Sequence, residues 1–264
     1  MTLFESAEDP PRCRLVLAYD GTNFRGFANQ RDVRTVAGVL GRALERVMRH
    51  PVPLTCAGRT DAGVHAWGQV VSFDADPGLD PWQLQGSLNG MLAPEIIVRD
   101  AEIVDASFDA RRSASWRSYR YTIVNRPQPD PFLARYAWWV PDPLDRSRLR
   151  LASDPFAGEH DFAAFCRKGP AGSTTIRRVL ESRWCELGDG VWRYEIRAQA
   201  FCWQMVRSIV GTLVDAGRGR RAPGEMLAIL RTRDRGAAAP IAPPHGLCLW
   251  SVGYDTDRAD ETPA

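Results

Sequence analysis

The order of strand-like and helix-like hydrophobic patterns is the feature that most restricts the fold of this chain. Residues 13–19 alternate apolar and polar side chains, which is typical of a half-buried strand. Residues 36–48 instead repeat apolar side chains at helical spacing, and Thr35 is a suitable N-cap. The two patterns recur to the end of the chain. They predict strands at residues 13–19, 54–57, 69–73, 96–104, 116–124, 136–140, 179–186, 191–198 and 247–252, and helices at residues 36–48, 81–91, from 145 onward, 204–216 and 223–230.

Hairpin-like pairs of strands mixed with helices predict an α+β fold, in which helices cover one face of a mostly antiparallel central sheet. The segment 126–131 holds three prolines in six residues and is typical of a linker. We therefore expect an N-terminal subdomain at residues 12–130 and a C-terminal subdomain at residues 131–254. The polar stretches 1–11 and 255–264 are expected to be a flexible leader and a flexible tail.

Composition is that of an ordinary globular protein, with 44% hydrophobic and 25% charged residues in 264. No window approaches the roughly 20 apolar residues of a membrane span, and the N-terminus lacks the pattern of a signal peptide. We therefore expect a cytoplasmic protein. The six cysteines form no C-x-x-C pair and the four histidines lie far apart, so neither a metal site nor another cofactor is expected.

The positive charge is carried almost entirely by arginine, and Lys168 is the sole lysine. The net charge of +2 does not by itself indicate a nucleic-acid partner. Guanidinium groups suit phosphate oxygens and stack on bases, although a solvated charged face explains any one cluster equally well. The clusters are Arg111, Arg112, Arg117 and Arg120; Arg177 and Arg178; Arg218, Arg220 and Arg221; and Arg231, Arg233 and Arg235.

The segment 57–66, with the sequence AGRTDAGVHA, is the strongest candidate for a reactive site. Gly58 and Gly63 bracket Arg59 and Asp61 on a predicted turn between two strands. Glycine permits close backbone approach, so such a loop can present a carboxylate to a flat ligand. The pattern alone leaves a second interpretation open, in which Asp61 only hydrogen-bonds its own backbone in the turn.

Four further segments appear with this loop, at residues 19–30, 117–121, 205–211 and 246–249. Their sequences are YDGTNFRGFANQ, RSYRY, MVRSIVG and GLCL. Together with the loop they resemble, in the same order, the motifs of the tRNA pseudouridine synthase A family over roughly residues 13 to 252. The resemblance implies the pseudouridine synthase fold, with two similar subdomains around a cleft. It also implies isomerisation of uridine in the anticodon stem-loop of tRNA, at tRNA positions 38–40, by a homodimer without a cofactor.

The resemblance assigns roles to individual side chains. Asp61 corresponds to the nucleophilic aspartate of the family, and Arg59 to a residue that helps displace the target nucleotide. Tyr119 is expected to stack on the target base, Arg207 to pair with the aspartate, and Leu247 to pack beside the base. Further candidates for RNA contact are Arg25, Phe27, Gln30 and His65.

The chemistry of the reaction agrees with these residue types. The target base must leave its stack, at a cost of a few kcal/mol, and an aromatic ring can return about 1–3 kcal/mol. Aspartate is ordinarily ionised at neutral pH, so Asp61 needs no general base before it acts covalently. Arg207 lies at the edge of the apolar arc of its helix, which fits both a half-buried ion pair and a side chain that reaches to solvent.

The chain departs from the family pattern at Phe27, Ala28, Gln204 and Ser208, and at the Cys-Trp pair before Gln204. These departures affect the details of RNA contact and leave the proposed nucleophile intact. Two other functions compete with that of a synthase. An RNA-binding protein without catalysis explains the arginines but not the Asp61 loop. A glycoside hydrolase would use Asp20 and Asp61 as paired carboxylates.

Overall fold

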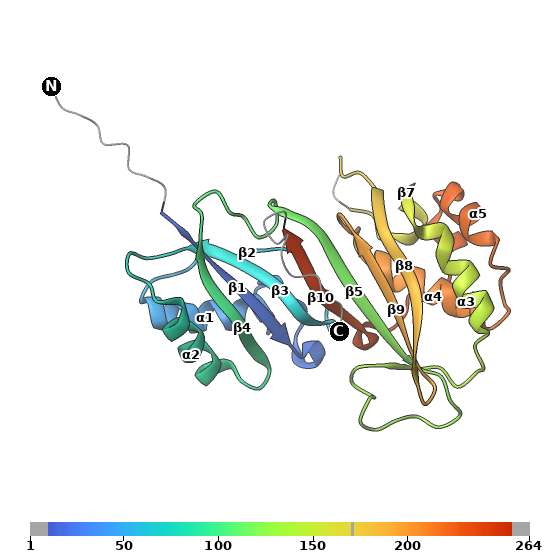
Figure 1. The fold of residues 1–264 in the computed structure, drawn as a ribbon, viewed down its shortest axis with the longest axis horizontal. Helices are drawn as coiled ribbons and strands as arrows, with labels where there is room; N and C mark the ends of the chain where they lie inside the picture. The colour runs from blue at the N-terminus through green and yellow to red at the C-terminus, as the bar shows by residue number, and fades with distance from the viewer. Residues whose placement is uncertain (1–9, 170–171, 255–264) are drawn as a thin grey trace.

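The computed structural model describes residues 10–169 and 172–254 (Figure 1). Apart from residues 10 and 11, the expected leader at residues 1–11 lies outside the described residues, and so does the expected tail at residues 255–264. The described part is an α+β fold, as predicted, in which helices pack on one large sheet.

The sheet has ten strands in the order β4-β1-β3-β10-β5-β9-β8-β7, with β2 beside β3 and β6 beside β5. Only the β3–β10 and β5–β6 pairs are parallel, so the prediction of a mostly antiparallel sheet is confirmed. The strands are β1 (Arg12–Tyr19), β2 (Thr55–Cys56), β3 (His65–Asp74), β4 (Ile96–Val104), β5 (Ala114–Val124), β6 (Trp138–Trp139), β7 (Gly158–Asp161), β8 (Ile176–Gly188), β9 (Val191–Ala198) and β10 (Leu247–Tyr254).

The helices form two groups at opposite ends of the sheet (Figure 1). Helices α1 and α2 pack at the β4–β1 end, and α3, α4 and α5 pack at the β8–β7 end. Buried side chains from both groups belong to one hydrophobic cluster, which also includes the middle strands. The helices are α1 (Val36–Met48), α2 (Pro81–Leu92), α3 (Arg146–Ser153), α4 (Met205–Gly217) and α5 (Glu225–Thr232).

Strand β10 joins the two halves of the sequence. It comes from the C-terminal end of the chain, yet it lies between β3 and β5 in the middle of the sheet (Figure 1). Its register places Cys248 opposite His65 on one side and Arg120 on the other. The sheet therefore runs without interruption through the middle of the molecule, and the division near residue 130 stays a prediction.

Capping side chains fix the starts of α1, α2 and α3. Thr35 accepts a hydrogen bond from the amide of Gly38 at the start of α1, as predicted. The side chain of Asp80 accepts hydrogen bonds from two amides at the start of α2, whose first residue is Pro81. Asp145 caps α3 through the amide of Arg148. These caps satisfy amides that have no partner within the helix.

Several strand predictions were wrong: β7 was not predicted, β8 is longer than the expected 179–186, and two further strands differ in extent. The strand expected at residues 69–73 begins four residues earlier, because a β-bulge interrupts the alternation of β3 opposite Leu17 and Tyr19. Only Trp138 and Trp139 form a strand within the segment predicted at 136–140, because the residues before them form a turn closed on the carbonyl of Leu133.

Helix α4 is buried on nearly all sides, which its sequence pattern did not predict. Gly211 permits the closest contact, because a β-carbon at this position would lie 2.0 Å from the carbonyl oxygen of Pro240. The segment that follows Pro240 also pairs with α4, since the amide of Ala242 donates to the carbonyl of Arg207 at 3.0 Å. Within the described residues, no helix combines the length and apolar character needed to cross a membrane.

Replacing Gly211 with alanine is expected to destabilise the protein by about 1–3 kcal/mol, since the backbone of Pro240 must move. The matched control is Gly86→Ala in α2, where no atom lies within 4 Å of the added methyl. Alanine is the better helix former, so this control should stabilise by up to about 1 kcal/mol. Urea unfolding of both variants measures the difference, and a stabilising Gly211→Ala would contradict the contact.

Candidate active site

The loop that carries Asp61 is fixed to the strands on either side of it. The side-chain amide of Gln69 donates to the carbonyl of Gly58 at 2.6 Å, and its oxygen accepts from the Gly58 amide at 3.4 Å. The hydroxyls of Tyr19 and Thr60 hydrogen-bond at 2.7 Å. Because Gln69, Tyr19 and Thr60 are buried, water does not compete for these hydrogen bonds. The loop residues that precede Asp61 are thus held before any ligand binds.

The segment 19–30 packs directly on the same loop. A β-carbon at Gly21 would lie 2.1 Å from the carbonyl oxygen of Val64, so only glycine fits there. The amide of Phe27 donates to the carbonyl of Thr60 at 3.0 Å. Two motifs that stand apart in the sequence therefore form one backbone unit around Asp61.

Asp61 forms hydrogen bonds through both carboxylate oxygens. Its Oδ2 accepts from a guanidinium nitrogen of Arg207 at 3.1 Å, and its Oδ1 accepts from the indole Nε1 of Trp203 at 2.9 Å. Arg207 lies in the first turn of α4, and its Nε donates to the carbonyl of Ala242 at 2.8 Å. The side chains of Asp61 and Arg207 are 26% and 10% exposed. The carboxylate is thus held on a largely buried cation and remains open to a ligand.

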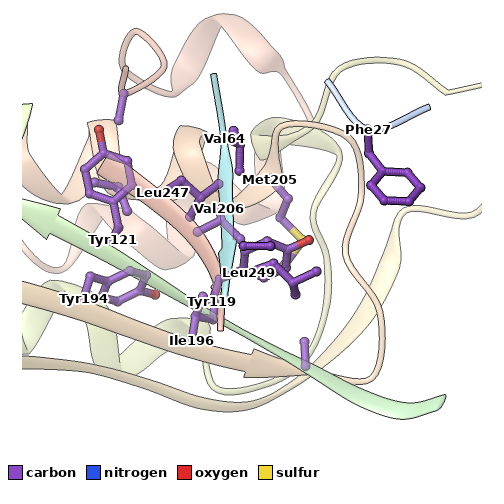
Figure 2. Close-up of a cluster of buried hydrophobic side chains, with 14 of the residues drawn as sticks. Phe27, Val64, Tyr119, Tyr121, Tyr194, Ile196, Met205, Val206, Leu247 and Leu249 are labelled. Carbon is purple, nitrogen blue, oxygen red and sulfur yellow. The ribbon is translucent and has the colours of Figure 1, made fainter. Parts of the chain in front are cut away.

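Tyr119 lies on β5 close to the loop, with its hydroxyl beside Gly58. Its ring meets Phe201 edge to face, with ring centroids 4.9 Å apart. Burial raises the pKa of Tyr119, so the hydroxyl stays protonated at neutral pH. Figure 2 shows Tyr119 in one buried cluster with Leu247 of β10 and Val206 of α4. The structure thus brings Asp61, Tyr119, Arg207 and Leu247 to the middle of the sheet.

The four candidates for RNA contact divide into exposed and buried residues. Arg25 and Gln30 are exposed. Phe27 is buried against Tyr19, and His65 is buried as well, so neither presents its side chain to solvent in this structure. Contact of these two side chains with RNA requires a rearrangement that the structure does not contain. Arg59, which the resemblance assigns to nucleotide displacement, is exposed two residues from Asp61.

His65 uses both ring nitrogens within the protein. Its Nδ1 accepts from the Gly21 amide at 3.0 Å, and its Nε2 lies 3.0 Å and 3.2 Å from the carbonyl oxygens of Arg135 and His245. This pattern fits a neutral ring with its proton on Nε2. Burial lowers the pKa of His65, although the carboxylate of Asp20, 3.2 Å from Nδ1, opposes that shift. His65 therefore links the end of the Asp61 loop to the backbone of Gly21, Arg135 and His245.

Asp20 caps the turn at residues 21–23, as the sequence suggested. Its carboxylate accepts hydrogen bonds from the amide and hydroxyl of Thr22 and from the hydroxyl of Tyr136. Asp61 is held by a different set of partners. The arrangement thus gives no support to a hydrolase that uses Asp20 and Asp61 as a pair.

Two arginines of the first cluster, Arg117 and Arg120, make contacts within the protein. Arg117 is buried, and its guanidinium donates to the carbonyls of Ala57, Arg111, Ala114 and Gln199. Because Ala57 immediately precedes the Asp61 loop, Arg117 fixes one end of it. Arg120 pairs with Glu195 at 3.0 Å and lies over the ring of Trp250.

Gln69, Arg117 and Trp203 are contributors to the site that sequence reasoning missed. Gln69 stands in a strand pattern and Arg117 in a basic cluster, and neither pattern signals contact with a loop. Trp203 lies 142 residues from Asp61 in the sequence. Among the described residues, no three His, Cys, Asp or Glu side chains gather in a geometry that could hold a metal ion.

Two of the departures from the family pattern, Gln204 and Ser208, lie at the start of α4. Gln204 adopts a left-handed conformation, with φ of 63°, immediately before the helix. Ser208 is fully buried one residue after Arg207. Neither side chain is among the hydrogen-bond partners of Asp61. Trp203, which also departs from the family pattern, does donate to Asp61, so the expectation that the departures do not touch the nucleophile was wrong.

The family model for tRNA pseudouridine synthase matches residues 15–111 and 152–255. Asp61, Trp203, Arg207 and Leu247 lie within these ranges, and Tyr119 lies outside them. The chain belongs to the tRNA pseudouridine synthase family, and it is an enzyme of the isomerase class.

Similar curated proteins extend over almost the whole chain. The tRNA pseudouridine synthase A of Brevibacillus brevis is 44% identical over 245 residues, that of Pseudothermotoga lettingae 40% over 243, and that of Bacillus subtilis 38% over 246. Each alignment covers 92% of this chain and 99% of the relative. Among solved structures, an archaeal box H/ACA Nop10–Cbf5 complex is 11% identical, with a TM-score of 0.37 over 88% of this chain and 46% of that chain. That likeness is too weak to support a conclusion.

Neutral His65 makes a testable contribution to stability. Because burial lowers its pKa in the folded state, the unfolded chain takes up a proton on His65 more readily as the pH falls below about 6.5. The stability that neutral His65 contributes is therefore present above that pH and is lost below it. Between about pH 7.5 and about pH 5.5, urea unfolding should show a larger loss for the wild type than for His65→Gln. Equal losses would show that His65 does not titrate in this way.

Proposed function

We propose that this enzyme converts uridine to pseudouridine in the anticodon stem-loop of tRNA, at tRNA positions 38–40, with Asp61 as its only covalent catalyst. The observation that carries the proposal is the contact of Asp61 with Arg207 at 3.1 Å, in a loop that the surrounding strands fix. A carboxylate held in this way is in place before the RNA arrives.

The reaction is an internal exchange of bonds. The bond from uracil N1 to the sugar C1′ breaks, the uracil rotates, and a bond forms from its C5 to C1′. The proton on C5 leaves, and N1 takes up a proton, so the atoms balance without an oxidant, a reductant or a second substrate. Asp61 forms a bond to the base or to the sugar during this exchange and is released unchanged.

The side chains around Asp61 fit the handling of a base taken out of its stack. Unstacking costs a few kcal/mol, and contact with an aromatic ring returns about 1–3 kcal/mol. We assign that contact to Tyr119, with Leu247 packing beside the base. Both side chains are buried in this structure, so the base reaches them only when neighbouring side chains move aside. Arg59 is exposed close to Asp61, where a guanidinium can take the place of the displaced nucleotide or hold its phosphate.

Arg207 is proposed to keep the charge of Asp61 in one place. Its guanidinium donates to the carbonyl of Ala242 and pairs with one carboxylate oxygen of Asp61.

A homodimer and a cytoplasmic location, which the motifs and composition imply, complete the proposal. Light scattering of the purified protein tests the homodimer.

The direct test measures tritium released from unmodified tRNA labelled at C5 of uridine. The wild type should release tritium into water, and Asp61→Ala should lose at least about 1000-fold of that rate, since it removes the covalent group. Binding of tRNA should survive in the variant and weaken with salt, because phosphate contacts are spread over several arginines.

Asp74→Ala is the matched control, because Asp74 is an exposed carboxylate at the end of β3 that pairs with Arg12. It should release tritium at the wild-type rate. No release by the wild type on any unmodified tRNA would refute the proposed reaction. Wild-type release by Asp61→Ala would refute the role of Asp61 alone.

A further inference from the structure

The indole of Trp203 is the second group that holds the carboxylate of Asp61. Trp203 lies between β9 and α4, and its Nε1 donates to Asp61 Oδ1 at 2.9 Å. Its side chain remains 49% exposed. A large aromatic side chain that is half exposed contributes little to the core, so its contact with Asp61 calls for another explanation.

Arg167 contacts both the indole ring and the backbone of Trp203. The guanidinium of Arg167 lies over the ring, 4.2 Å from its centroid. The backbone amide of Arg167 donates to the carbonyl of Trp203 at 3.0 Å. A cation over an aromatic ring is attracted to it, so Arg167 keeps the ring in this orientation. The Nε1 hydrogen thus points at Asp61 from a fixed position.

The two donors on Asp61 restrict the rotation of its carboxylate about the bond to Cβ. The bond between Cβ and the carboxylate of an aspartate rotates over a broad range, because no staggered minimum restricts it. Arg207 holds only Oδ2, which leaves the carboxylate free to turn about that contact. A donor on Oδ1 removes this freedom. Each carboxylate oxygen accepts more than one hydrogen bond, so the indole leaves lone pairs on Asp61 available.

We propose that Trp203 is a positioning residue of this enzyme, which fixes the plane of the Asp61 carboxylate through its indole N–H. The inference rests on the proposed function, since it assigns Trp203 to the same reaction. Trp203 is neutral, so it orients the carboxylate without adding to the positive charge that Arg207 supplies. The indole N–H, and not the apolar ring, is the part that matters.

The test compares kcat and KM of three variants with the wild type on the same unmodified tRNA, by tritium release. Trp203→Phe keeps an aromatic ring and removes the donor, and its kcat should fall about tenfold, the usual order of effect for one hydrogen bond to a charged group, with KM within twofold. Trp203→His restores a ring N–H and should recover most of the loss. Trp82→Phe, at a tryptophan of α2 that is 80% exposed, is the matched control and should behave as the wild type.

Each other outcome counts against the proposal. A kcat of Trp203→Phe within twofold of the wild type would show that the indole does not position Asp61. A higher kcat/KM would show that the indole obstructs the carboxylate. An equal loss in Trp203→Phe and Trp203→His, together with a lower melting temperature in both, would show a merely structural role. Activity of the wild type in the same assay separates all three outcomes from failure of the proposed function, because an inactive wild type overturns both.

Discussion

The ion pair of Asp61 with Arg207 is the interaction on which the rest of the site depends. It connects the loop after β2 to the first turn of α4, across 146 residues of sequence. Burying two charges is costly unless further hydrogen bonds satisfy them. The carbonyl of Ala242 and the indole of Trp203 supply those hydrogen bonds, so the pair is stable in a partly desolvated position and stays accessible at Asp61.

The sheet explains why the positions of Asp61 and Arg207 relative to each other are fixed. Strand β10 lies between β3 and β5, and so the two halves of the chain share one framework at the point where the site lies. Gln69 on β3 and Arg117 on β5 then fix Gly58 and Ala57, at the start of the loop. Preorganisation of this kind places a catalytic group before the substrate binds, which is where most of its effect on rate arises.

The sequence predicted the parts of the structure that depend on local pattern. Alternation gave β4 and β9 with the bounds that the structure has, and the capping residue Thr35 located the start of α1. Of the two glycines that bracket the loop, Gly63 adopts a positive φ of 76°, whereas a β-carbon at Gly58 would only approach the Tyr119 hydroxyl at 3.7 Å. The close backbone contact with the loop comes from Gly21 instead. Local pattern failed where a distant segment decides the outcome. The bulge in β3 depends on its pairing with β1. The burial of nearly all of α4 and the contact of Trp203 with Asp61 depend on segments that no spacing in the sequence relates.

The most direct test of the central ion pair is the kcat and KM of Arg207→Ala on unmodified tRNA, with circular dichroism to verify that α4 is intact. Because Asp61 would lose its fixed charge partner, the account predicts a fall in kcat of about 100-fold, with tRNA binding retained. Turnover near that of the wild type, in a folded variant, would show that Asp61 acts without Arg207 and would contradict the account.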